Sequence, residues 1–281
     1  MFSTLISTVD LAARVSAPDI VIVDCRHDLA QPDTWGQAQY QRAHLPGAVF
    51  AHLDRDLSAT KTATNGRHPL PSPAACSAVF GRLGIDASKQ VVVYDSANGM
   101  YASRMWWMLR WLGHDSAAVL DGGFDKWLHE GRPVTADLTA PRNAIFPVRR
   151  VGPVVDAATI ETRLANRSQL LIDARAPERF RGDVEPMDPV AGHIPGAVNR
   201  PYAQNLSAHA TFKPADALRA EFETLLDDRP ASTVVHQCGS GVSACHNLLA
   251  MEIAGLTGAQ LYPGSWSEWC ADPSRPVARG A

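Results

Sequence analysis

One stretch of the chain, residues 233–244, decides how the rest is interpreted. It reads Thr-Val-Val-His-Gln-Cys-Gly-Ser-Gly-Val-Ser-Ala, so that Cys238 follows a short apolar run. We expect a buried strand before the cysteine, a tight loop after it and a helix that ends near Gly255. The glycines at 239 and 241 let the backbone curl around the sulfur. Backbone N–H groups and the dipole at a helix start stabilise a thiolate, so the stretch predicts a nucleophilic cysteine at position 238.

The cysteine loop belongs to the second of two repeats. An apolar run ending in Asp-x-Arg occurs at Asp24 and again at Asp173, and the turn His-x-Pro-Gly-Ala-Val begins at His44 and again at His193. Two further landmarks keep the same order, with residues 91–95 matching 234–238 and residues 122–127 matching 264–269. Short apolar strands alternate with helical stretches in both halves. This predicts an α/β fold, a tandem duplication in which each domain is a mostly parallel sheet with helices on both faces.

The repeats also set the expected domain boundaries. The chain from residue 136 to residue 153 is rich in Pro, Arg and Thr and has weak periodicity. We therefore expect an N-terminal domain over residues 1–137, a linker over 138–153 and a C-terminal domain over 154–281. The first domain has Asp95 at the position of Cys238, and a carboxylate cannot act as a sulfur nucleophile. The second domain is thus expected to be the catalytic one, and the first to be inactive.

Composition excludes several classes of protein. The net charge of −3 over 281 residues gives no broad basic field, so neither nucleic acid nor an anionic membrane is an expected partner. No apolar run approaches the roughly 18 residues of a membrane span, and the first residues lack the basic region of a secretory signal. The five cysteines are odd in number and sparse, which favours free thiols in a cytoplasmic protein.

Together these features resemble the two-domain rhodanese family of sulfurtransferases. The resemblance covers both Asp-x-Arg strands, both His-x-Pro-Gly-Ala-Val turns, the linker and the cysteine loop. It implies that Cys238 takes a sulfane sulfur from a small-molecule donor as a persulfide and passes it to an acceptor thiol, cyanide or a thioredoxin-like protein. Such a ping-pong scheme needs no metal and no organic cofactor. The His236, Cys238, Cys245 and His246 group lacks a C-x2-C knuckle, which argues against zinc.

The loop favours 3-mercaptopyruvate as the donor. Gly239 and Ser240 stand where the family's thiosulfate enzymes more often carry Arg and Lys, cations that stabilise a dianion. Mercaptopyruvate is a monocarboxylate with a thiol proton to move, which suits a hydroxyl and a histidine. The resemblance to the mercaptopyruvate branch implies that Ser240 pairs with His68, from Gly-Arg-His-Pro-Leu-Pro, and that the nearest upstream acid, Asp56, orients the histidine.

The same branch binds the substrate carboxylate with two arginines. One corresponds to Arg179, but the other falls at Met187, which cannot bind a carboxylate; Arg181 could replace it. The remaining substrate-binding residues implied by the loop are Gly239, Gly241, Val242 and Ser243, the last replacing a threonine and keeping its hydroxyl.

Three alternative functions are to be weighed against this one. Met187 leaves a thiosulfate sulfurtransferase open. A sulfur carrier or interaction module without turnover is a second alternative, although such modules often lose the cysteine. A cysteine phosphatase or arsenate reductase would need C-x5-R to grip its oxyanion, and Ala244 stands at the position of that arginine.

Overall fold

The computed structural model describes residues 1–140, 143–165 and 168–280 and divides into two compact units. The first unit comprises residues 1–59, 71–152 and 209–211, and the second comprises residues 60–70, 153–208 and 212–281. Segment 60–70 therefore folds with the second unit although its neighbours in sequence belong to the first. The expected linker, residues 138–153, falls with the first unit up to Gly152.

The first unit is built on a five-stranded sheet of order β1-β5-β4-β2-β3, in which every pair is parallel. Its strands are β1 (Leu5–Ile6), β2 (Ile20–Asp24), β3 (Val49–Phe50), β4 (Gln90–Tyr94) and β5 (Ala117–Leu120). Its helices are α1 (Thr8–Ala12), α2 (Trp35–Arg42), α3 (Leu53–Asp56), α4 (Pro73–Arg82), α5 (Ala102–Trp111) and α6 (Gly123–His129).

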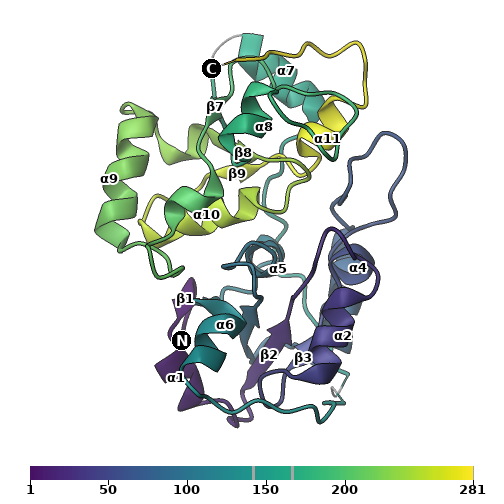
Figure 1. Cartoon of the computed structure of the whole chain (residues 1–281), viewed down its shortest axis with the longest axis vertical. Helices are drawn as coiled ribbons and strands as arrows, with labels where there is room; N and C mark the ends of the chain where they lie inside the picture. Colours follow the sequence, from purple (N-terminus) through teal and green to yellow (C-terminus); the bar gives the residue numbers. More distant parts are fainter. Residues whose placement is uncertain (141–142, 166–167, 281) are drawn as a thin grey trace. The chain divides into compact units, whose positions relative to one another are not determined.

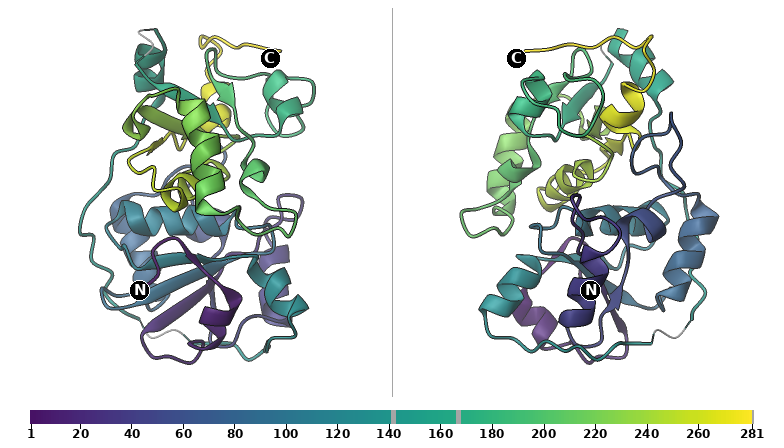
Figure 2. Two further views of the ribbon diagram at one scale, coloured as in Figure 1. Left: turned by 90° about the vertical axis from the view of Figure 1, so that its left-hand side faces the viewer. Right: turned by 45° about the vertical axis from the view of Figure 1, so that its right-hand side comes forward.

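Helices cover both faces of this sheet (Figures 1 and 2). Leu11 of α1, Tyr40 of α2 and Trp127 of α6 pack in one core cluster with alternate residues of β4, while α5 contacts β4 and β5. The three valines of β4, Val91–Val93, are fully buried. A continuous apolar run of this kind is typical of a central parallel strand that is covered on both sides.

The second unit repeats the plan with a four-stranded parallel sheet of order β7-β6-β8-β9. Its strands are β6 (Leu170–Asp173), β7 (Val198–Asn199), β8 (Val234–Gln237) and β9 (Gln260–Leu261). Its helices are α7 (Ala157–Ala165), α8 (Pro177–Arg181), α9 (Ala215–Leu226), α10 (Ala244–Ile253) and α11 (Ser265–Trp269), with 3₁₀ turns η1 (Tyr202–Asn205) and η2 (Ala231–Thr233). One core cluster joins α7 and α11 to the sheet, and α10 packs on β8, β9 and α9.

The landmarks of the duplication have structural roles in both units. The carboxylates of Asp24 and Asp173 each bind the arginine two residues later in a buried ion pair. The Nδ1 atoms of His44 and His193 lie 2.6 Å and 2.8 Å from backbone carbonyl oxygens. These contacts fix the turns that follow the strands, so the repeated histidines serve the fold. Across the described residues, no helix is long and apolar enough to cross a membrane.

Candidate active site

Cys238 lies directly after β8, at the carboxyl end of a central parallel strand, where open α/β sheets commonly bind ligands. The loop that it opens leads into α10 and is held by the first turn of α11. The Cys238 N–H donates to Ser265 Oγ at 3.1 Å, and the carbonyl oxygens of Cys238 and Gly239 accept from the N–H groups of Trp266 and Ser267 at 3.0 Å and 2.9 Å. Cys238 is buried, with 2% of the residue exposed.

Gly241 gives the loop its tight turn. Its φ is +76°, and a β-carbon there would lie 2.3 Å from the carbonyl oxygen of Pro263. Only glycine adopts this conformation without strain and allows such a close approach of two backbone segments. The glycine predicted to let the backbone curl around the sulfur is therefore required on both counts.

The first unit shows what this loop shape does. Asp95 follows β4 as Cys238 follows β8, and its carboxylate accepts hydrogen bonds from four backbone N–H groups at 2.8–2.9 Å, those of Ala97, Gly99, Tyr101 and Ala102. Burial raises the pKa of Asp95, while these four hydrogen bonds act to lower it. A loop after this strand can thus surround a negative atom with N–H groups. Because Asp95 and Cys238 occupy the same position in the two repeats, we expect the N–H groups of the second loop to stabilise a thiolate or persulfide at Cys238.

The histidine and serine that were expected to pair are in contact. His68 comes from segment 60–70, which folds within the second unit, and its Nδ1 lies 2.7 Å from Ser240 Oγ. Both side chains are buried, with 6% of each residue exposed. The segment is anchored beside the cysteine loop because the Arg67 N–H donates to Ser267 Oγ at 3.0 Å. The pair can therefore move a proton at a site from which most water is excluded.

Two arginines converge on the residue after the cysteine. A β-carbon built on Gly239 would lie 2.7 Å from Arg67 Nη2 and 3.4 Å from Arg179 Nη1. Asp188 binds both side chains, because Oδ1 pairs with Arg67 Nη1 and Oδ2 lies 3.4 Å from Arg179 Nη2. Glu185 adds a 2.6 Å ion pair to Arg179 Nη2. Burial alone would raise the pKa of Glu185, but the hydrogen bond and charge of Arg179, together with two backbone hydrogen bonds, outweigh it and lower that pKa.

Two of the predicted residues have partners outside this group. The Arg181 guanidinium pairs with Asp183 at 2.7 Å, and its side chain is 41% exposed. Asp56 belongs to the first unit, where its carboxylate accepts from the His52 N–H at 2.8 Å and pairs with Arg82. An orienting role of Asp56 toward His68 stays a prediction. Of the other loop positions, Val242 is buried and Ser243 immediately precedes α10.

Sequence reasoning missed Arg67 and Asp188. Arg67 is adjacent to His68, yet its partner Asp188 lies 121 residues further along the chain. The only available signal was a basic residue next to a candidate catalytic histidine, together with the missing arginine at Met187. These two observations suggest that another cation replaces the missing arginine, but they do not identify which residue supplies it.

The other cysteines are less suited to nucleophilic chemistry. None of the five cysteines of the chain is in a disulfide, and all five are buried. Burial raises the pKa of Cys76 and of Cys270 to about 11 and holds that of Cys25 well above its ordinary value. The Cys245 thiol donates to the Gly241 carbonyl oxygen at 3.4 Å. A thiol that stays protonated is a weak nucleophile, which leaves the loop cysteine as the candidate.

One group of side chains in the first unit has the composition of a metal site. His27, His52 and Asp54 place one potential ligand atom each within 4.8 Å of one another. However, His52 Nδ1 accepts the N–H groups of Asp54 and Arg55 at 3.1 Å and 3.4 Å, as the cap of α3. The neutral ring then carries its proton on Nε2, so neither nitrogen has a lone pair to offer a metal. The group fits a helix cap better than a metal centre.

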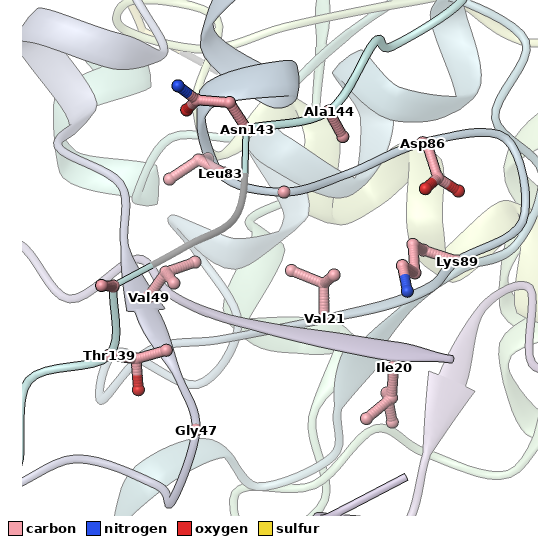
Figure 3. Close-up of a pocket in the computed structure, with 12 residues that line it drawn as sticks. Ile20, Val21, Gly47, Val49, Leu83, Asp86, Lys89, Thr139, Asn143 and Ala144 are labelled. Carbon is pink, nitrogen blue, oxygen red and sulfur yellow. The ribbon is translucent and has the colours of Figure 1, made fainter. Parts of the chain in front are cut away.

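The first unit also has a surface cavity of about 330 Å³, shown in Figure 3. Its lining includes Val21, Val49 and Leu83, with Asp86 and Lys89 as charged groups. Asp86 is engaged with Ser88, which lowers the pKa of Asp86 by hydrogen bonding. None of the described residues that line the cavity is a cysteine, serine or histidine, so these residues offer no group for sulfur transfer.

The geometry of the second unit agrees with comparisons to known proteins. A sequence profile of the Rhodanese-like domain matches residues 7–130 and 156–272. The chain belongs to the rhodanese family. The chain is 46% identical over 279 residues to a probable 3-mercaptopyruvate sulfurtransferase of Pseudomonas aeruginosa, covering 98% of each protein. It is 42% identical over 284 residues to the putative thiosulfate sulfurtransferase SseB of Mycobacterium tuberculosis, covering 98% of this chain and 97% of SseB.

A solved rhodanese-family structure matches as well. The 3-mercaptopyruvate sulfotransferase SseA of Escherichia coli superimposes with a TM-score of 0.81 at 29% identity, covering 95% of this chain and all of SseA. The predicted tandem rhodanese fold is therefore confirmed, and the chain is a sulfurtransferase, as the cysteine loop indicated. The relatives divide between two sulfur donors, so their names alone do not decide the substrate.

Proposed function

We propose that the chain transfers sulfur from 3-mercaptopyruvate through a persulfide on Cys238, and that the first unit, which excludes segment 60–70, takes no part in bond breaking. The Cys238 thiolate attacks the donor sulfur, the carbon–sulfur bond breaks, and pyruvate leaves as its enolate. The S–H proton of the donor ends on the methyl carbon of pyruvate, so one proton must move from sulfur to carbon while no net proton is consumed. An acceptor thiolate or cyanide then removes the outer sulfur and regenerates the thiolate.

The observation that carries this proposal is the 2.7 Å contact between His68 Nδ1 and Ser240 Oγ. A hydroxyl and an imidazole in contact can accept the S–H proton and deliver a proton to the enolate. Transfer from thiosulfate requires no such relay, because sulfite leaves with its electron pair and no hydrogen atom is involved. A buried proton relay beside the sulfur therefore favours the mercapto acid.

Thiosulfate is the second candidate, because Arg67 and Arg179 beside Gly239 would also attract a sulfonate. Their charge is offset locally by Asp188 and Glu185, which bind the same guanidinium groups. A site whose two cations are matched by two anions suits a monocarboxylate better than a dianion. The acceptor is proposed to be a cellular thiol or a thioredoxin-like protein, and free cysteines throughout the chain support a cytoplasmic setting.

The test is steady-state sulfur transfer to cyanide with each donor, using the wild type and Cys238→Ser. The proposal predicts a kcat/KM for 3-mercaptopyruvate at least tenfold above that for thiosulfate, and loss of both activities in the variant. A preference for thiosulfate would overturn the donor assignment. Stoichiometric sulfur loading without turnover would instead indicate a carrier.

A further inference from the structure

We propose that Arg67 supplies the second cation of the donor site and, with Arg179, binds the carboxylate of a 2-oxo acid thiol beside Cys238. This rests on the proposed function and assigns a specificity-determining role to a residue outside the cysteine loop. It also explains how the site can have a second cation although Met187 stands at the position of the expected arginine, because Arg67 comes from a different segment of the chain.

The two guanidinium groups present donors toward the same place. Arg67 uses Nη1 for Asp188 and directs Nη2 at the position of a Gly239 β-carbon, while Arg179 uses Nη2 for its acidic partners and directs Nη1 there. Within the described part of the chain, the Nε atoms of both arginines are buried without a hydrogen-bond partner. Their side chains are only 15% and 18% exposed. Donors that converge in this way, on guanidinium groups whose Nε atoms also lack a partner, suit a planar anion with two oxygens.

Asp188 explains why this pair forms. Glu185 Oε1 accepts the N–H groups of Met187 and Asp188, each at 3.1 Å, which folds the chain into a turn. The turn leaves Met187 37% exposed and buries the Asp188 side chain to 3% exposure. Met187 stands where a cation was expected, and the next residue, Asp188, is a buried anion. The Asp188 carboxylate binds both Arg67 and Arg179 and so holds the two guanidinium groups side by side.

Gly239 is part of the same arrangement. A side chain at this position would displace the Arg67 guanidinium, since even a β-carbon would approach Nη2 to 2.7 Å. The glycine thus leaves room for a cation that arrives from segment 60–70. The Arg67 N–H anchors segment 60–70 to Ser267, and the next residue, His68, contacts Ser240. Through these two residues, the same short segment orients the donor and moves its proton.

The experiment compares Arg67→Gln and Arg67→Lys with the wild type, using 3-mercaptopyruvate as donor and pyruvate as a competing product. Loss of a charge-assisted hydrogen bond weakens binding by about 10- to 100-fold. We expect Arg67→Gln to raise the KM for mercaptopyruvate and the inhibition constant of pyruvate by the same factor, with a much smaller change in kcat. Arg67→Lys should fall between, because a lysine keeps the charge and loses the planar fork.

Two arginine variants serve as comparisons. Arg219→Gln removes an exposed arginine that pairs with Glu223 on α9 and should leave every constant unchanged. Arg181→Gln tests the replacement suggested by the sequence and should also leave the pyruvate constant unchanged. If Arg181→Gln weakens pyruvate binding and Arg67→Gln does not, the assignment to Arg67 is wrong.

The possible failures are distinct. A wild type that uses thiosulfate and not mercaptopyruvate contradicts the proposed function. A wild type that uses mercaptopyruvate, with an Arg67→Gln variant whose pyruvate constant is unchanged, contradicts only this inference. A purely structural role of Arg67 would lower kcat in proportion to the loss of folded protein and leave both binding constants as they were.

Discussion

Replacing Ser240 with alanine should separate the two candidate donors. The substitution removes one oxygen atom from a buried loop and takes away the hydroxyl that contacts His68 at 2.7 Å. A positioned proton relay contributes about 10²- to 10⁴-fold to a rate. The kcat/KM for 3-mercaptopyruvate should therefore fall at least about 100-fold, equivalent to about 3 kcal/mol of lost transition-state stabilisation. Transfer from thiosulfate moves no proton and should change less than about threefold.

The assay measures thiocyanate formation with both donors at saturating cyanide, for the wild type, Ser240→Ala and a control. Ser274→Ala is a suitable control because Ser274 is exposed and bonds Asp272. Equal losses with both donors would mean that the hydroxyl serves the loop and not the proton. An unchanged rate with mercaptopyruvate would refute the relay, and with it the main reason for preferring this donor.

Three further predictions concern the stability of the two units. Gly241→Ala should lower the free energy of unfolding by more than about 2 kcal/mol in urea titrations, because the new β-carbon would meet the Pro263 carbonyl oxygen. Gly239→Ala is the control: its β-carbon would meet only side-chain atoms, so its free energy of unfolding should be nearer to that of the wild type. Asp95→Ala should cost at least about 3 kcal/mol, since four backbone N–H groups lose their acceptor. Burial, with the charge of a nearby arginine, lowers the pKa of His236 to about 3. Its neutral ring supports the fold above the ordinary pKa, and this support is lost as the pH falls toward 3, by about 2 kcal/mol at pH 5. His236→Leu should flatten the fall in unfolding free energy between pH 7 and pH 5 by that amount; an unchanged slope would show that other groups control it.

The parts of the fold that the sequence predicts are those set by local pattern and repetition. The buried valines of β4 and the strand before Cys238 could be read because parallel strands covered on both faces form continuous apolar runs. Two copies of the strand–turn landmarks then gave the tandem arrangement. The loop glycines could be interpreted because a tight turn at a helix start requires a particular backbone conformation.

The donor site was only half predictable, because its contacts join distant segments. Nothing local shows that segment 60–70 folds with the second unit or that Arg67 pairs with Asp188. The resemblance to a family supplied His68 and Arg179, but it also directed attention to the position of Met187, where the arginine that the resemblance implies is missing. The replacement is a tertiary feature: a buried aspartate in a turn recruits an arginine from elsewhere in the chain.

The most direct test of the account is the fate of the donor sulfur in a single turnover. The chain is mixed with 3-mercaptopyruvate without any acceptor, and the released pyruvate and the mass of each cysteine-containing peptide are measured. The account predicts one pyruvate per chain and the mass of one added sulfur atom on the Cys238 peptide, removed by cyanide and absent in Cys238→Ser. Sulfur on another cysteine, or pyruvate release that survives in Cys238→Ser, would contradict it.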